Sequence, residues 1–293
     1  MKKLASEKTN IIICCGEDKS EYHKQFINAL SKQFNVSFFK KSSFYKKTDT
    51  ILTIGGDGTL NFLINNLNLK DDSTNEELPK ILYYPDGTAN DFAKSLNYPQ
   101  WEKLSVKRIC DIINKNSFIH IPIMKCNDQF FINVLTAGAP AQVTDSGNSM
   151  LKEIVGKFSY YLNALEEIIS PTLYNISYQC NNEDINEVTT YGFLVSQGLY
   201  AGGGVKVNNS LAAHFDKYFN FTIPNNDNIA SIITDMIELQ KEEGKITEIN
   251  SYNCEKLLIK TNKEIPIKLD GEEYHSRDLT IEKTKCSLPF YLP

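Results

Sequence analysis

The sequence lacks a long apolar run, a surplus of basic residues and a C-x-x-C pair. No apolar stretch approaches the roughly 18 to 20 residues that a helix needs to span a bilayer, so we expect no transmembrane segment. The net charge of −5 argues against nucleic acid as the main partner, because surplus Lys and Arg hold phosphate backbones. The seven cysteines, an odd number, predict reduced thiols in a soluble cytoplasmic protein.

The length and the order of apolar segments predict two domains. With 293 residues, of which 41% are hydrophobic, the chain is long enough for both. Buried strands at about 11–15, 36–39, 51–54 and 81–84, with intervening helices, predict an α/β domain over residues 1–120. From about residue 120, a long helix at 150–169 and short alternating strands predict an antiparallel, β-sandwich-like domain over 121–280. The predicted fold class is therefore α/β plus β.

The stretch ILTIGGDGTLNFLINNL, residues 51–67, is a predicted strand, glycine-rich turn and helix. Its turn consists of Gly55, Gly56, Asp57, Gly58, Thr59, Leu60 and Asn61. The glycines permit positive φ and let backbone N–H groups approach a bound group, which favours an anion such as phosphate. A carboxylate among phosphates needs a cation between them, so Asp57 suggests bound Mg²⁺ or a hydroxyl to orient. The alternative is a structural turn with a capping Asp or Thr.

A second strand–turn–helix with polar residues follows at PDGTANDFAKSLN, residues 85–97. Thr88 offers a hydroxyl, while Asn90 and Asp91 stand at the predicted start of the helix; plain N-capping is the alternative for those two. Because neighbouring parallel strands end at the same edge of a sheet, we expect the two polar turns to face one site.

Residues 40–47, KKSSFYKK, place four lysines around Phe44 and Tyr45. Aromatic residues among lysines could contact an anionic membrane or a nucleotide. A solvated loop is the alternative.

Two of these motifs resemble the diacylglycerol kinase catalytic-domain family. GGDGTL at 55–60 and PDGTANDFA at 85–93 match the family motifs GGDGT and P-x-G-T-x-N-D-F-A. FINV at 131–134, AGGG at 201–204 and LDGE at 269–272 extend the similarity to the soluble bacterial lipid kinases of that family. NAD kinases share a GGDG turn, but PDGTANDFA does not look like their sequence. The resemblance implies a nucleotide-binding α/β domain, a larger β-sandwich domain, and a chain end, about 281–293, that returns to the first.

The resemblance also implies ATP-dependent phosphorylation of a lipid in phospholipid metabolism. Residues 55–61, Thr88, Asn90 and Asp91 would bind ATP, with Asp57 holding Mg²⁺ directly or through water. Glu272 would accept the proton of the lipid hydroxyl, and Asp270 would orient Glu272 or Mg²⁺. The lipid would be taken from a membrane surface by a peripheral enzyme, and a homodimer is left open.

The sequence departs from the family pattern at three places. Pro122 stands where relatives usually carry an aspartate, and proline cannot ligate a metal. A structural Mg²⁺ would be held by Asp216 with carbonyls of Ala213 and Tyr218, but Lys217 replaces the usual glycine there. The short link between 39 and 51 predicts a shortened or absent helix. These departures leave open a family member that binds lipid or nucleotide without transfer. A NAD-kinase-like enzyme with a soluble substrate is the other alternative.

Overall fold

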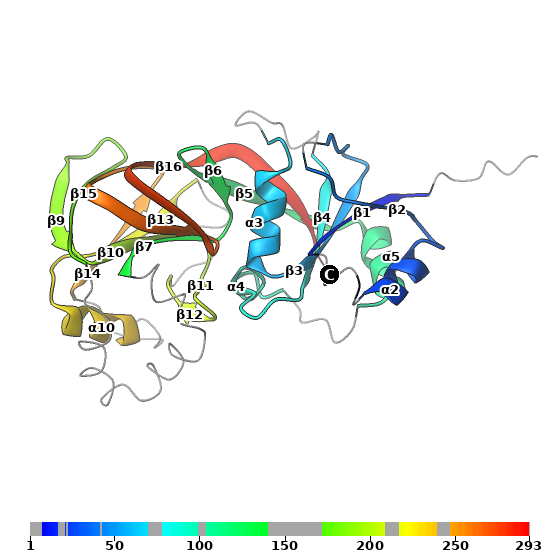
Figure 1. Cartoon of the computed structure of the whole chain (residues 1–293), viewed down its shortest axis with the longest axis horizontal. Helices are drawn as coiled ribbons and strands as arrows, with labels where there is room; N and C mark the ends of the chain where they lie inside the picture. Colours follow the sequence, from blue (N-terminus) through cyan, green and yellow to red (C-terminus); the bar gives the residue numbers. More distant parts are fainter. Residues whose placement is uncertain are drawn as a thin grey trace, which may run out of the picture. The chain divides into compact units, whose positions relative to one another are not determined.

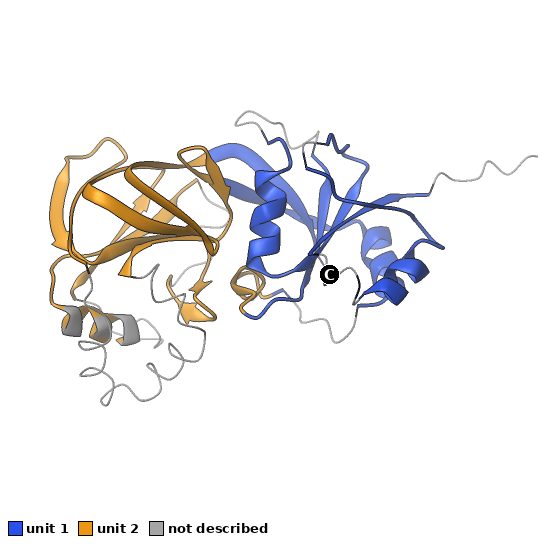
Figure 2. Cartoon of the chain, viewed as in Figure 1, with its two compact units in different colours: residues 1–88, 98–123, 284–293 blue, residues 89–97, 124–283 orange. Residues whose placement is uncertain are grey.

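The computed structural model describes residues 8–16, 21, 23–41, 43–69, 78–98, 104–139, 172–208, 217–238 and 247–292. It divides into two compact units (Figure 2). Unit 1 comprises residues 1–88, 98–123 and 284–293, and unit 2 comprises residues 89–97 and 124–283. Strands β5 (Phe118–Cys126) and β16 (Glu272–Tyr291) contribute residues to both units. The long helix predicted at 150–169 lies outside the described residues.

Unit 1 is built on a parallel sheet. Its strands are β1 (Asn10–Cys15), β2 (Asn35–Phe38), β3 (Thr50–Gly55) and β4 (Lys80–Pro85), in the order β4-β3-β1-β2, with the end of β16 parallel to β4. Every residue of β3 is buried. Strands covered on both faces carry continuous apolar runs, as β1, β3 and β4 do in the sequence.

Helices cover both faces of this sheet (Figure 1). Helix α3 (Asp57–Asn65) lies on one face, and α2 (Lys24–Leu30) and α5 (Val106–Lys115) lie on the other. Alternate residues of β1 and β3, including Ile11, Ile13, Leu52 and Ile54, form one core with the apolar sides of α2 and α5. At the N-terminus of α5, the Ser105 hydroxyl accepts a hydrogen bond from the backbone N–H of Arg108 at 3.3 Å, which is ordinary N-capping.

Unit 2 is an antiparallel β structure. Strands β14 (Ile249–Cys254), β13 (Phe219–Pro224), β10 (Gly192–Ser196), β7 (Val134–Gly138) and β15 (Lys256–Leu269) pair in that order. Strand β15 pairs further with β16 and with β8 (Tyr174–Cys180), and β8 pairs with β9 (Asn186–Thr190). The remaining elements are β6 (Gln129–Phe131), β11 (Tyr200–Ala201), β12 (Val205–Lys206), α4 (Asp91–Ser95) and α10 (Ile229–Glu238).

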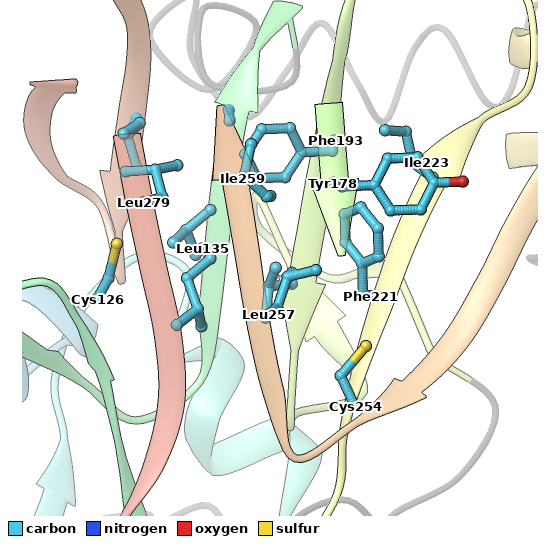
Figure 3. Close-up of a cluster of buried hydrophobic side chains, with 14 of the residues drawn as sticks. Cys126, Leu135, Tyr178, Phe193, Phe221, Ile223, Cys254, Leu257, Ile259 and Leu279 are labelled. Atoms are coloured by element: carbon cyan, nitrogen blue, oxygen red, sulfur yellow. The ribbon is translucent and has the colours of Figure 1, made fainter. Parts of the chain in front are cut away.

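The core of unit 2 lies between its strands, as Figure 3 shows. Strands β8 and β13 alternate buried and less buried residues, so each contributes one apolar side. The ring of Phe221 meets those of Tyr178 and Phe193 edge to face, with centroids 5.2 and 5.9 Å away, and the three rings fill the space between strands. The predicted α/β plus β fold class is confirmed by these two units.

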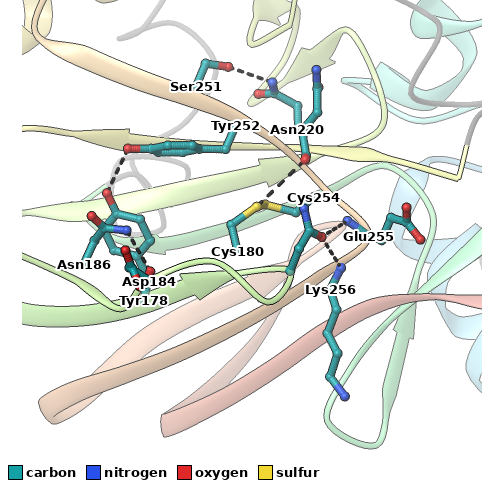
Figure 4. Close-up of a disulfide and its surroundings, with 12 residues drawn as sticks. Tyr178, Cys180, Asp184, Asn186, Asn220, Ser251, Tyr252, Cys254, Glu255 and Lys256 are labelled. Carbon is teal, nitrogen blue, oxygen red and sulfur yellow. Dashed lines mark hydrogen bonds between the residues drawn. A yellow bond between two sulfur atoms is a disulfide. The ribbon is translucent and has the colours of Figure 1, made fainter.

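One pair of cysteines contradicts the prediction of reduced thiols. Cys180 and Cys254, which end β8 and β14, form a disulfide with their Cα atoms 5.6 Å apart (Figure 4). Nearby, the Asn181 side chain accepts hydrogen bonds from the N–H groups of Glu255 and Lys256 at 2.7 and 3.3 Å. The two cysteines stand 74 residues apart in the sequence. Their spacing therefore carried no signal, because only the course of the strands brings them together.

The other five cysteines are free. Burial raises the pKa of the Cys14 and Cys126 thiols to about 12, so both stay protonated near neutral pH. Their role is packing.

Candidate active site

The glycine-rich turn of unit 1 passes directly from β3 into α3. A Cβ atom on Gly55 would lie 2.2 Å from the Thr59 hydroxyl oxygen, so this position excludes every side chain. The expectation of positive φ is wrong, because Gly55, Gly56 and Gly58 all have φ values outside that region. Gly56 is the N-cap of α3 with an extended backbone, φ −93° and ψ −164°. The turn needs glycine for close approach rather than for left-handed geometry.

Asp57 is the first residue of α3 and is partly exposed. In the first turn of a helix, a carboxylate is stabilised by the positive end of the helix dipole. Leu60 and Asn61 of the same motif point elsewhere, since Leu60 is fully buried and Asn61 is 2% exposed. Of the side chains predicted to contact ATP in this motif, Asp57 and Thr59 are therefore the exposed ones.

The turn after β4 lies beside the turn after β3. The parallel register pairs Gly55 with Pro85, and the N–H of Asp86 donates to the carbonyl oxygen of Gly55 at 2.9 Å. The hydroxyl-bearing Thr88 follows two residues later in the same unit. The two polar turns thus share one edge of the sheet, as the parallel order predicted.

A histidine that sequence reasoning missed also reaches this edge. His23 Nε2 lies 3.4 Å from a carboxylate oxygen of Asp86, and its ring meets that of Tyr84 edge to face at 6.2 Å. His23 is the residue directly before α2, in a part of the sequence that holds no glycine motif. No local pattern marked it, because its partner is 63 residues away.

Asn90 and Asp91, at the end of the second motif, lie at the start of α4, where Asp91 makes contacts within unit 2. Asn90 has left-handed geometry at the start of α4, and Asp91 is 4% exposed. Asp91 Oδ2 accepts a hydrogen bond from the N–H of Gly203 at 2.8 Å, and Lys94 Nζ lies 3.8 Å from Oδ1. Burial raises the pKa of the Asp91 carboxyl, although the Gly203 and Gly204 N–H groups and Lys94 oppose that shift. Asn90 and Asp91 belong to unit 2, where α4 is hydrogen-bonded to the loop at Gly203.

The AGGG motif forms the turn that Asp91 holds. Gly202, Gly203 and Gly204 have φ values of +59°, +91° and +104°, so this turn does require left-handed backbone. It joins the short strands β11 and β12.

Two further residues of unit 2 fix the strand that leads into this turn. The Ser95 hydroxyl accepts hydrogen bonds from the N–H groups of Leu199 and Tyr200 at 2.9 and 3.2 Å, and Asn133 Nδ2 donates to the Tyr200 carbonyl at 2.9 Å. A Cβ on Gly198 would lie 1.7 Å from Asn133 Oδ1. Helix α4, the FINV segment and the AGGG turn are therefore one hydrogen-bonded cluster.

The LDGE motif is a tight hairpin between β15 and β16. Asp270 and Gly271 have φ values of +49° and +101°, and Leu269 pairs with Glu272 across the turn. The Asp270 carboxylate, 5% exposed, accepts three backbone hydrogen bonds, from Ile132 at 2.7 Å and from Asn133 and Val134 at 2.9 Å. These contacts join Asp270 to the FINV backbone. Glu272 itself is exposed at the start of β16.

The predicted residues thus fall into two groups. Residues 55–61 and Thr88 lie in unit 1, whereas Asn90, Asp91, Asp270 and Glu272 lie in unit 2. Pro122, half-buried in β5, lies in unit 1.

No group of three or more His, Cys, Asp or Glu residues is placed to hold a metal ion within the part of the chain that the structure describes. Ala213 and Asp216, two of the three residues predicted to hold a structural Mg²⁺, lie outside the described residues. Beside the third, Tyr218, the Lys217 ammonium pairs with the Glu255 carboxylate and lies 4.7 Å from the Tyr218 ring centroid.

The two units define a class of protein in which an α/β unit of the nucleotide-binding type is joined to an antiparallel β unit. Residues 19–126 match the family described as diacylglycerol kinase catalytic domain. A diacylglycerol kinase of Staphylococcus carnosus is 26% identical over 255 residues, which cover 83% of this chain and 76% of that protein. These two comparisons confirm the resemblance to the diacylglycerol kinase catalytic-domain family.

Solved structures show the same fold. A diacylglycerol kinase from Bacillus anthracis superposes with a TM-score of 0.66 at 18% identity, over 98% of this chain and 97% of that one. An NAD kinase from Archaeoglobus fulgidus, solved with ATP, superposes with a TM-score of 0.55 at 13% identity, over 96% and 92% of the two chains. Within the described residues, no helix is long and apolar enough to cross a membrane.

Proposed function

We propose that this protein is an ATP-dependent lipid kinase, which transfers the γ-phosphate of ATP to a lipid hydroxyl. The observation that carries the proposal is the pair of polar turns at one edge of the unit 1 sheet, joined by the hydrogen bond from Asp86 to Gly55. These turns are the two motifs that lie within the family match over residues 19–126. Diacylglycerol, phosphatidylglycerol and sphingoid bases are the candidate acceptors.

The residues of unit 1 suit the binding of ATP phosphates. Helix α3 starts at Asp57, directly after the N-cap Gly56, so the backbone N–H groups of its first turn point out of the helix end, where helices bind phosphate oxygens. Thr88, on the neighbouring turn, adds a hydroxyl. Carboxylate oxygens are the ligands that Mg²⁺ prefers, and Asp57 is the partly exposed acid of this turn, so its chemistry fits a magnesium ion. Bound Mg²⁺ would supply neutralisation of phosphate charge.

In unit 2, Glu272 is our candidate for the general base that accepts the proton of the lipid hydroxyl. It follows Gly271 in a hairpin whose turn residue Asp270 is fixed by three backbone donors. Asp270 is therefore proposed as a positioning residue, which holds the hairpin and so limits the range of places that Glu272 can occupy.

A transfer assay tests this function. Purified protein would be incubated with γ-labelled ATP, Mg²⁺ and a total lipid extract, and label would be counted in the organic phase. Label in that phase supports the proposal. Label found only on added NAD would reject it in favour of the NAD-kinase-like enzyme. Measurable ATP binding without any transfer would favour a family member that has lost catalysis, which Pro122 and Lys217 suggest.

Single substitutions assign the roles. Removing a general base lowers the rate by about 10²- to 10⁴-fold, so Glu272→Gln should lose at least about a hundredfold in kcat. Glu273→Gln removes the same charge one residue along β16, where Glu273 is also exposed, and should keep full activity. Asp57→Ala should abolish transfer while circular dichroism stays unchanged. An active Asp57→Ala enzyme would refute the role given to that carboxylate.

A further inference from the structure

An exposed patch of aromatic and basic side chains lies on unit 1, at β2 and helix α3. Residues 38–48, FFKKSSFYKKT, contain three phenylalanines, one tyrosine, four lysines and no acidic residue, in a chain of net charge −5. The segment begins at the end of β2, which among the described strands pairs only with β1 and so lies at the edge of the parallel sheet. We call the described residues 38–41 and 43–48, together with Phe62 of α3, the edge patch.

The edge patch has an ordered aromatic base. The ring of Phe39 stacks on that of Tyr45 with centroids 5.1 Å apart and meets Phe62 edge to face at 6.2 Å. The Tyr45 hydroxyl accepts from the N–H of Lys40 at 2.7 Å and donates to the Lys40 carbonyl at 3.0 Å, which closes the segment into a loop. Phe62 belongs to a helix that is packed on the sheet. The base is therefore tied to the fold at both β2 and α3.

Large apolar side chains project from this base into solvent. Phe44 is 94% exposed, Phe38 is 48% exposed and Phe62 is 39% exposed. Single exposed apolar residues are ordinary, but exposed phenylalanines among four lysines, with Phe44 next to Tyr45 and Phe62 against Phe39, mark an interaction site. The side chains of Lys40, Lys41, Lys46 and Lys47 are exposed around them, and Lys41 Nζ lies 5.0 Å from the centre of the Phe62 ring.

We propose that the edge patch docks the protein on the surface of an anionic lipid bilayer. Lysines next to such a surface are attracted by its negative potential, and aromatic rings favour the headgroup layer, where one side is apolar and the other wet. The remainder of the chain carries a net charge of −9 when these four lysines are subtracted from −5, so the patch would also select which face turns to the membrane. The inference rests on the proposed function in one respect, because a bilayer is where a lipid substrate would be found.

Charge geometry favours a bilayer over a nucleotide as the partner. The four lysines occur as two pairs, Lys40–Lys41 and Lys46–Lys47, on either side of Phe44 in the loop. Lys47 also lowers the pKa of Lys80, although burial of Lys80 contributes more to that shift. Because β2 runs parallel to β1 and β3, Lys40 and Lys41 follow β2 at the Gly55 end of the sheet, whereas Lys46 and Lys47 precede β3 at the opposite end. Lysines spread over the length of the strands are suited to a broad anionic surface rather than to one phosphate group.

Vesicle binding without ATP tests the docking surface separately from catalysis. The full-length protein would be sedimented with vesicles of phosphatidylcholine alone and of equal parts phosphatidylcholine and phosphatidylglycerol, at low and high salt. We expect binding to the anionic vesicles only, with a loss at high salt because screening weakens the attraction. Equal binding to both vesicle types would overturn the proposal.

Three variants locate the surface. Each lysine near an anionic membrane contributes roughly fivefold in affinity, so Lys40→Gln/Lys41→Gln should lower the partition coefficient about 25-fold. Phe44→Ser should weaken binding while leaving all charges in place, and its exposed position makes a folding defect unexpected. The matched control, Lys107→Gln/Lys115→Gln, removes two exposed lysines from α5 and should bind as wild type.

The outcomes separate docking from catalysis. An equal loss of binding in the α5 control, or no loss in Phe44→Ser, would refute the edge patch. A raised KM for ATP with unchanged vesicle binding would show instead that the patch contacts nucleotide. Vesicle binding that depends on the patch in a protein without kinase activity would reject the proposed function and keep the docking surface.

Discussion

The Asp270 carboxylate provides the sharpest test of how the LDGE hairpin is held. In Asp270→Asn, the amide oxygen can still accept from Asn133 and Val134, but an NH₂ group replaces the oxygen that accepts from Ile132 at 2.7 Å. Hydrogen bonds to a charged acceptor are worth about 1 kcal/mol more than neutral ones, so the two retained bonds lose about 2 kcal/mol. The buried Ile132 N–H left facing another donor costs about 1 to 3 kcal/mol more.

The total, about 3 to 5 kcal/mol, corresponds to a loss of roughly a thousandfold in local stability. We would measure it as hydrogen exchange of the Ile132, Asn133 and Val134 amides, because local opening exposes these groups without unfolding the whole chain. Glu273→Gln, which removes an exposed charge from the same hairpin, should leave their protection unchanged. Protection that falls by less than about tenfold in Asp270→Asn would refute the reasoning.

Three other predictions follow from the described contacts. Gly55→Ala should lower the free energy of unfolding by about 1 to 3 kcal/mol, since its Cβ would lie 2.2 Å from the Thr59 hydroxyl. The urea midpoint should fall accordingly, and an unchanged midpoint would contradict the clash. The pKa of Asp91 is raised from 3.8, so the folded state binds this proton more tightly than the unfolded state does. Stability should therefore fall as pH rises from about 4 through the folded pKa. Urea titrations across pH should show this dependence in the wild type and not in Asp91→Asn. Denatured, unreduced protein should show five reactive thiols, and seven thiols without reductant would disprove the disulfide. Reduction of Cys180–Cys254, which are 74 residues apart, should lower the free energy of unfolding by up to about 4 kcal/mol.

The parallel sheet of unit 1 and its two polar turns were predictable because the signals are local. Buried parallel strands leave continuous apolar runs, such as ILTI in β3, and a glycine-rich turn interrupts each run at its end. The order of strands then brings the turns to one edge without any further information. The alternation of apolar and polar residues in β8 and β13 likewise predicted the antiparallel unit.

The contacts that organise unit 2 could not be predicted, because each joins residues distant in sequence. The Asp91 side chain reads as a helix cap, yet it binds Gly203, 112 residues away. Asp270 reads as part of a hairpin turn, which it is, but its three backbone partners lie in the FINV segment. The error at Gly55 has a related cause, since the glycine is required by the position of the Thr59 side chain and not by its own φ.

The contacts of helix α4 also bear on the order in which parts of the newly synthesised chain can fold. Asp91 accepts a hydrogen bond from the N–H of Gly203, and Ser95 accepts hydrogen bonds from those of Leu199 and Tyr200. The two acceptors are synthesised roughly a hundred residues before these donors. At about 5 to 20 residues per second, a ribosome takes on the order of ten seconds to cover that interval. During this time the polar groups of α4 must remain hydrated. Strands β1 to β4 can pair before the hydrogen-bond partners of α4 are synthesised. The last part of the PDGTANDFA motif should therefore become ordered well after its first part.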